Sequence, residues 1–225
     1  MVVHMGAAIS TEPLASGSIE HMFESAGETH DGGLTPSAFL AGFTSLLGAA
    51  SAVDTDPGRI DSVRVFEQAK CMLEAAQAAV AVAFDTSQRT EQQAAGVPAT
   101  QQGRGVAAQL ALARRESPYR GTQHLGLAKI LSTEMPHTWA AFTAGRISEW
   151  RATLLARETA CLDVEHRRIV DKELAADPDA LEQMGDRQLV AAAARLAYQL
   201  DPHAVVARRA AAEKERRVSL RPPPT

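Results

Sequence analysis

Alanine is the feature of this chain that most restricts its fold. It supplies 43 of the 225 residues and gathers in runs such as AAQAAVAVAF (75–84) and VAAAARLAY (190–198). Alanine has the highest intrinsic helix propensity. Because strand-like alternation is scarce and aromatic residues make up only 4% of the chain, nothing competes with helix formation. The sequence therefore predicts an all-α fold.

The longest predicted helix runs from Arg59 to about Gln93. Its apolar residues recur at steps of three or four, which is the spacing typical of a helical stripe. A stripe of about 30 residues favours a long core helix packed within its own domain, and a dimer seam is the alternative. The stripe consists of Ile60, Val63, Phe66, Ala69, Leu73, Ala76, Val80 and Ala83.

Capping residues and prolines divide the rest of the chain into short helices. Serine and aspartate cap the first free amides of a helix, and proline suits its first turn. We predict about eight helices, with N-caps at Ser117, Ser148, Asp163 and Asp186, a turn at 54–58 and a break at 177–179. The predicted helices other than the long one cover 36 to about 50, 106–116, 118–132, 136–144, 148–161, 163–176, 186–200 and a last stretch from 202.

Composition suggests how these helices are organised. We interpret residues 1–35 as a mobile leader and residues 36–225 as one helical domain. Within that domain, residues 36–95 form the N-terminal helices and residues 104–225 a second region, separated by the Gly- and Pro-containing loop AAGVPATQQGRG (94–105). The tail RRVSLRPPPT (216–225) has the alternating pattern of the first residues of a strand, which its three prolines then interrupt. We therefore expect the natural chain to continue, so that this one is truncated.

Charge is distributed unevenly along the chain, whose net charge is −4. Residues 1–100 carry 4 Lys and Arg against 12 Asp and Glu, a net charge of −8, whereas residues 101–225 carry 19 against 15, a net charge of +4. An anionic partner is therefore expected at the second half. Two cysteines form no disulfide framework, and the start of the chain lacks a secretory signal. We expect a cytoplasmic protein without a membrane span.

The stretch RRESPYRGTQHLG (114–126) is the strongest candidate site. Its Ser-Pro pair predicts that one helix ends and another begins here, as in a helix-turn-helix. In that interpretation the first turn of the second helix enters the major groove of DNA, and the preceding arginines bind phosphates. An ordinary solvated helical corner is the competing interpretation. The candidate DNA-binding residues are Arg114, Arg115, Tyr119, Arg120, Gln123 and His124.

A second group of cations lies at the end of the last predicted helix. It forms a secondary basic patch of Arg208, Arg209, Lys214, Arg216 and Arg217. Cations at a helix C-terminus are favoured by the helix dipole, so a local explanation competes with a nucleic-acid patch.

Several stretches resemble a known family. They are ESPYRGTQHLGLAKIL, EMPHTWAAFTAGRISEWRATLLARETACLD, LVAAAARLAYQLDP and ERRVSLRPPP. They resemble an actinobacterial repeat family whose shared region is a domain of unknown function, number 222, and the similarity runs from about Val106 to Thr225. Members of that family commonly carry this helical region followed by an HNH endonuclease module. The resemblance implies a role next to DNA.

An HNH site requires clustered histidines that bind a divalent metal, together with an asparagine. This chain contains no asparagine, and its seven histidines are scattered. We therefore expect no catalytic site and no cofactor in this chain, with the divalent metal confined to a separate nuclease module. Full-length relatives would be HNH endonucleases.

Part of the same region, residues 113–159, is also similar to the helix-turn-helix of partition-type DNA-binding proteins. Gly145, Arg146, Ile147 and Ser148 match the last element of that pattern, whereas the interval from Ser117 to Pro136 is longer by about a turn.

These observations predict a non-catalytic helical region that binds or positions double-stranded DNA. The alternative is a helical protein-interaction or dimerisation module without direct DNA contact, in which a homodimer is the partner arrangement.

Overall fold

The computed structural model describes residues 36–51 and 54–215, and all regular structure within them is helical. Ten α-helices and one 3-10 turn cover these residues, which confirms the predicted all-α fold. The chain divides into two compact units, residues 1–53 and residues 54–225. The leader predicted at 1–35 and the strand start predicted in the tail 216–225 lie outside the described residues.

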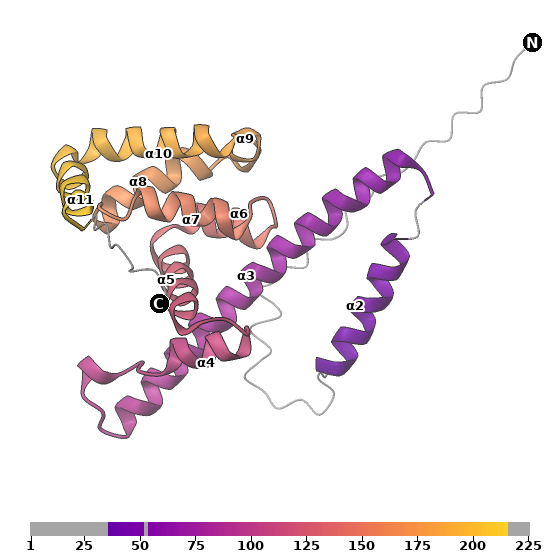
Figure 1. The fold of residues 1–225 in the computed structure, drawn as a ribbon, viewed down its shortest axis with the longest axis horizontal. Helices are drawn as coiled ribbons and strands as arrows, with labels where there is room; N and C mark the ends of the chain where they lie inside the picture. Colours follow the sequence, from indigo (N-terminus) through magenta and orange to yellow (C-terminus); the bar gives the residue numbers. More distant parts are fainter. Residues whose placement is uncertain (1–35, 52–53, 216–225) are drawn as a thin grey trace, which may run out of the picture. The chain divides into compact units, whose positions relative to one another are not determined.

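The first unit contains one described helix, and the second contains all the others (Figure 1). In the first unit, α2 begins at the predicted Pro36. The helices of the second unit follow one another with short connections. The elements are α2 (Pro36–Ser51), α3 (Asp56–Ala94), η2 (Ala99–Gln101), α4 (Val106–Ala113), α5 (Pro118–Glu134), α6 (Pro136–Thr143), α7 (Glu149–Glu158), α8 (Val164–Ala175), α9 (Pro178–Gln183), α10 (Asp186–Leu200) and α11 (Pro202–Glu215).

Side-chain caps start most of these helices at the predicted positions. The Oγ of Ser117 accepts from the third residue of α5, and Ser148 and Asp163 cap α7 and α8 in the same way. Asp177, predicted to break the chain, instead caps the short helix α9. The predicted cap Asp186 is wrong by one residue, because it is the first residue of α10.

The long helix α3 buries a different face from the one predicted. Its buried residues are Cys71, Ala75 and Asp85, which lie toward α4, α5, α6 and α7. In contrast, Leu73 and Val80 of the predicted stripe are 39% and 56% exposed. Two residues along a helix are about 200° apart, so Cys71 and Leu73 necessarily point to opposite sides. The core interpretation of the stripe is therefore wrong within this unit.

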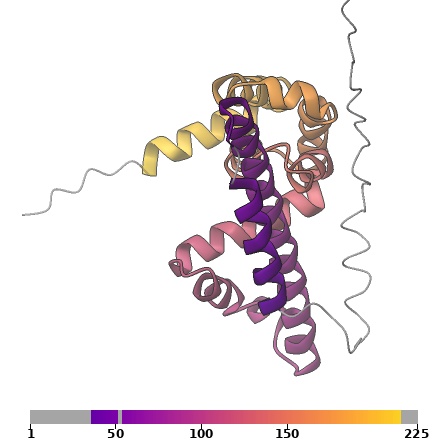
Figure 2. The ribbon, with the colours of Figure 1, turned by 90° about the vertical axis from the view of Figure 1, so that its right-hand side faces the viewer.

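The main core lies where α6, α7, α8 and α10 meet. Phe142 of α6, Leu155 of α7, Val170 of α8 and Leu189 of α10 are at most 1% exposed and belong to one cluster. Figures 1 and 2 show α8, α9 and α10 grouped away from the C-terminal end of α3, near which α4 and α5 lie. The candidate corner lies at the N-terminal end of α5, whereas Leu131 in the C-terminal half of the same helix belongs to the main core cluster.

The pair α4 and α5 packs closely because of Gly121. A Cβ atom at this position would lie 2.2 Å from the backbone oxygen of Ala107 and 2.7 Å from the Cβ of Ala111. Only glycine allows the second turn of α5 to approach α4 at this distance. The crossing fixes the direction in which the first turn of α5 leaves the corner.

Candidate nucleic-acid interface

The corner between α4 and α5 begins with a Schellman turn. The amide of Arg115 donates to the carbonyl of Leu112 (3.1 Å), and the amide of Glu116 donates to the carbonyl of Ala111 (2.8 Å). This pair of bonds defines the motif and requires a left-handed residue just after the helix. Arg115 occupies that position, with a φ of 58°. The helix predicted to reach residue 116 therefore ends at Ala113, and the next residues form the turn.

Arginine is an unusual residue at this position of the turn. Two other helices of the chain, α3 and α6, end with the same bond pattern, and each places a glycine there: Gly96 with a φ of 78° and Gly145 with a φ of 72°. Among the described residues, Arg115 is the one non-glycine residue with a positive φ. A left-handed conformation costs an L-residue about 1–2 kcal/mol. Arg115 is therefore kept at this position at a cost in stability.

Two of the six candidate residues hold the corner together. Arg114 donates from Nη1 to the side-chain oxygen of Gln77 on α3 (2.6 Å), and its Nε lies 3.5 Å from Glu116. His124 lies between two carboxylates, with Nδ1 2.6 Å from Glu149 and Nε2 3.0 Å from Glu116. Both side chains are about four-fifths buried. They connect the corner to α3 and α7, so they are poorly placed to meet a partner.

The other four candidates face solvent. Arg115, Tyr119, Arg120 and Gln123 are all exposed, and Tyr119 is 72% exposed. Within the described residues, no carboxylate pairs with Arg115 or Arg120. The structure thus divides the predicted cluster into an outward set of four residues and an inward pair.

The sequence analysis missed one residue of this surface, Leu112. It is the most exposed large hydrophobic residue among those described, at 80%, and it lies one turn before Arg115. The signal was present, because Ala111 and Leu112 are neighbours on a short helix and only one of them can face α5. We use the name outer corner for Leu112, Arg115, Tyr119, Arg120 and Gln123.

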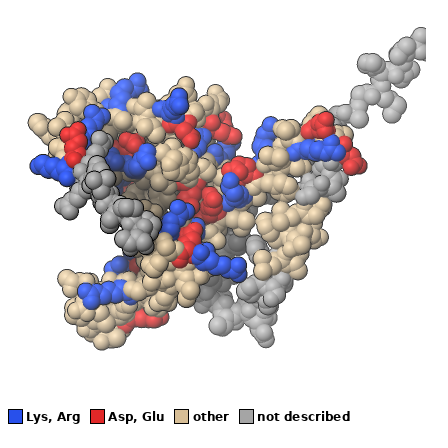
Figure 3. Space-filling view, viewed as in Figure 1, with Lys and Arg blue, Asp and Glu red and all other residues tan. Residues whose placement is uncertain are grey.

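Charges of both signs are mixed on the face drawn in Figure 3. Lysine and arginine side chains alternate with aspartate and glutamate over the helices, and no large area of one sign is present there. A polyanion that met this face would find single cations rather than a broad positive field.

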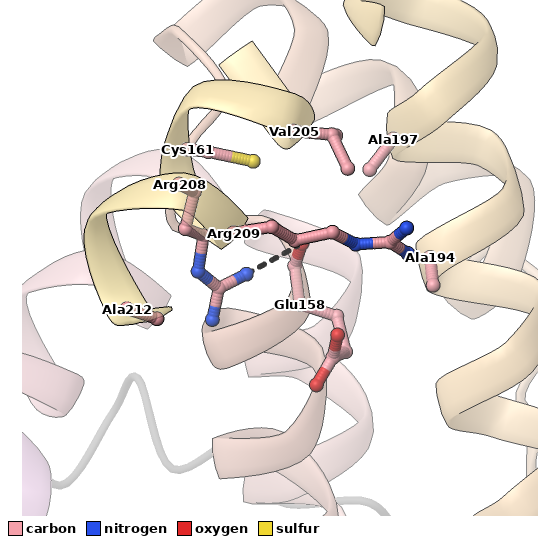
Figure 4. Close-up of a pocket in the computed structure, with 8 residues that line it drawn as sticks. All are labelled: Glu158, Cys161, Ala194, Ala197, Val205, Arg208, Arg209 and Ala212. Carbon is pink, nitrogen blue, oxygen red and sulfur yellow. Dashed lines mark hydrogen bonds between the residues drawn. The ribbon is translucent and has the colours of Figure 1, made fainter. Parts of the chain in front are cut away.

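The secondary basic patch is only partly described. Arg208 and Arg209 line a shallow pocket between α7, α10 and α11, next to Glu158 and Cys161 (Figure 4). The guanidinium of Arg208 donates to the backbone oxygen of Glu158 (3.5 Å), whereas Arg209 extends across the pocket toward Ala194. Lys214 is exposed near the end of α11. Arg216 and Arg217 lie outside the described residues.

Two arginines near the last element of the partition-like pattern, Arg146 and Arg151, are occupied by internal partners. Arg146 forms ion pairs with Asp179 and Glu182, and Arg151 donates to the carbonyls of Leu181 and Met184 at 2.7 and 2.8 Å. These contacts connect α7 and the turn before it to α9. The arginines that precede and begin α7 therefore hold the fold together.

A buried carboxylate of α3 forms ion pairs that hold α5, the second helix of the corner, against α3. Asp85 of α3 is 2% exposed and accepts hydrogen bonds from Arg89 (2.7 Å) and from Lys129 of α5. Burial alone would raise the pKa of the Asp85 carboxyl, but the bonds from these two cations outweigh burial and hold the pKa below its ordinary value. This pair ties α5 to α3.

The family of the chain follows from a comparison with family models. The model of a domain of unknown function, DUF222, matches residues 66–224. The chain belongs to the DUF222 family. The match begins well before Val106, from which the sequence comparison expected it to start, so most of α3 is part of the DUF222 region. No curated protein and no solved structure matches the chain.

The described residues contain neither a membrane-spanning helix nor a cluster of metal-binding side chains. None of the described helices combines the length and the apolar character that a membrane span requires. Within the same residues, no group of three or more His, Cys, Asp and Glu side chains has an arrangement that could hold a metal ion.

Proposed function

We propose that this DUF222 chain binds or positions double-stranded DNA through the outer corner, without catalysis of its own. In this proposal the chemistry belongs to an HNH nuclease module in another part of a longer protein. That association rests on the resemblance of the chain to actinobacterial proteins that carry such a module.

Arg115 is the observation that carries the proposal. A glycine would relieve the left-handed strain, as it does at the ends of α3 and α6, yet an exposed arginine is present. Strained residues that persist in a structure mark functional positions more often than ordinary ones. An arginine that is strained, exposed and without a carboxylate partner suits a phosphate contact.

The geometry of the two helices supports the same function. A helix of eight residues, a turn of four and a second helix with an exposed first turn match the arrangement of a helix-turn-helix. In that arrangement Arg120 and Gln123 lie where base edges are read, and Gln123 has the amide that pairs with adenine. Arg115 would bind the phosphate backbone at the edge of the groove.

A mobility-shift assay at two or more salt concentrations tests the proposal. The double variant Arg115→Ala/Arg120→Ala should bind duplex DNA more weakly, and the slope of log affinity against log salt should fall by about 0.9, because in this proposal Arg115 contacts a phosphate whereas Arg120 contacts base edges. The matched control is Arg187→Ala/Arg195→Ala, which removes two exposed arginines from α10. Equal loss of binding in both variants, or no loss in either, would refute the proposal.

One observation favours the alternative function, a protein-interaction module. Leu112 and Tyr119 expose apolar surface next to two arginines, and interface hot spots are enriched in tyrosine and arginine. A chain that fails to bind duplex DNA at low salt, but loses a protein partner when Leu112 is replaced by aspartate, would support that function instead.

A further inference from the structure

We infer that the exposed stripe of α3 pairs with the same stripe of a second copy of the chain, as an antiparallel two-helix seam. The seam consists of Phe66, Ala69, Leu73, Ala76, Val80 and Ala83. This inference does not depend on DNA binding.

The stripe lies on the side of α3 that the rest of its unit leaves open. Cys71, Ala75 and Asp85 face α4 to α7, and the seam residues lie about half a turn around the helix from them. Leu73 and Val80 are 39% and 56% exposed and Ala83 is exposed, whereas Phe66, Ala69 and Ala76 are half-buried. Within residues 75–90 of α3, the charged residues are Asp85 and Arg89. These two bond to each other on the side of α3 opposite to the stripe. No charged side chain therefore keeps this part of the stripe in water.

The spacing of the stripe fits an antiparallel second copy. The steps between successive seam residues are three, four, three, four and three, a series that reads the same in both directions. An antiparallel partner then pairs Phe66 with Ala83, Ala69 with Val80, and Leu73 with Ala76, so that every layer joins a large residue with a small one. A parallel partner would pair each residue with itself and alternate wide layers with narrow ones. Even layers pack at a constant distance between helices.

Charge complementarity gives the same register. Arg59, which pairs with Asp56 at 2.5 Å, and Glu91, which accepts from Gln88, are both exposed. They lie within about 40° of each other around the helix, beyond opposite ends of the seam. In the antiparallel pairing, Arg59 of one copy lies one residue from the position opposite Glu91 of the other. Two such ion pairs, one at each end, would flank the seam, whose outermost layers are about 26 Å apart along the helix.

Sedimentation equilibrium of the full chain at micromolar concentration tests the inference. The wild-type chain should be a dimer, and Leu73→Glu or Val80→Glu should raise its dissociation constant at least about 100-fold, because each buries two carboxylates per dimer. Ile60→Glu is the matched control, since Ile60 is 62% exposed on the same helix but lies about 200° from Val80. Circular dichroism should show that all three variants keep the wild-type helix content.

The register is tested by charge reversal. Arg59→Glu alone should weaken the dimer, and adding Glu91→Arg should restore it. A wild-type chain that is monomeric at every concentration overturns the inference. So does a monomer that loses stability on Leu73→Glu, because the stripe is then covered from within the chain. Equal dissociation by Ile60→Glu overturns it as well.

Discussion

Replacing Arg115 by glycine separates the stability of the corner from its function. The substitution relieves the left-handed strain of about 1–2 kcal/mol. Glycine also loses more conformational entropy on folding, which costs about 0.5–1 kcal/mol. The net effect should be a gain in unfolding free energy of about 0.5–1 kcal/mol, with a rise in Tm of roughly 1–4 °C for a unit of this size. DNA binding should weaken at the same time, because one phosphate contact is lost.

The two glycines at equivalent positions calibrate this prediction. Gly96→Ala introduces a side chain into open space, so its expected loss of about 0.5–1 kcal/mol measures the left-handed strain less the conformational entropy that alanine saves on folding. Gly145→Ala should cost more, because its Cβ would also lie 2.7 Å from the backbone oxygen of Gln68. Urea unfolding followed by circular dichroism gives all three values on one scale.

One result would refute the reasoning about this corner. If Arg115→Gly lowers the unfolding free energy while Gly96→Ala also lowers it, Arg115 contributes stability through contacts that outweigh its backbone strain. Its presence would then have a structural reason, and the argument from strain to function would fail.

Two further predictions concern buried carboxylates. Asp171, which is 1% exposed, accepts hydrogen bonds from the amides of His137 and Thr138 and from the Thr138 hydroxyl, and so caps α6. Asp171→Ala should therefore lower the unfolding free energy, measured by urea unfolding, by about 2–4 kcal/mol. A loss under about 1 kcal/mol would contradict this role. Because the pKa of Asp85 is lowered in the folded chain, its contribution should be present above the ordinary carboxyl pKa of about 4 and vanish as pH falls through the folded value. The stability difference between wild type and Asp85→Asn should therefore shrink below about pH 4, and a difference that is constant with pH would contradict the assignment.

Local signals were sufficient to predict most helix boundaries. Ser117, Ser148 and Asp163 each cap the helix that the sequence places after them, since a cap and its amide are at most three residues apart. The same rule explains the missed helix α9. Asp177 followed by Pro178 is the same cap-and-proline pair that starts α5 and α11, but the six-residue helix was read as a break.

Side-chain partners distant in sequence could not be predicted. The sequence places Arg114 and His124 at the corner, yet Gln77 and Glu149, which hold their side chains inward, are 37 and 25 residues away. The buried face of α3 was missed for a related reason. Asp85 has the sequence context of a surface residue, and its burial becomes favourable through its bonds to Arg89 and to Lys129 of α5, the second of which is distant in sequence.

Ultraviolet cross-linking of the full chain to a DNA duplex, followed by peptide mapping, tests the central proposal most directly. Cross-links are expected within residues 112–123, centred on Tyr119, and they should be lost at high salt together with binding. Cross-links confined to α10 and α11, or a chain that forms none at low salt, would contradict it.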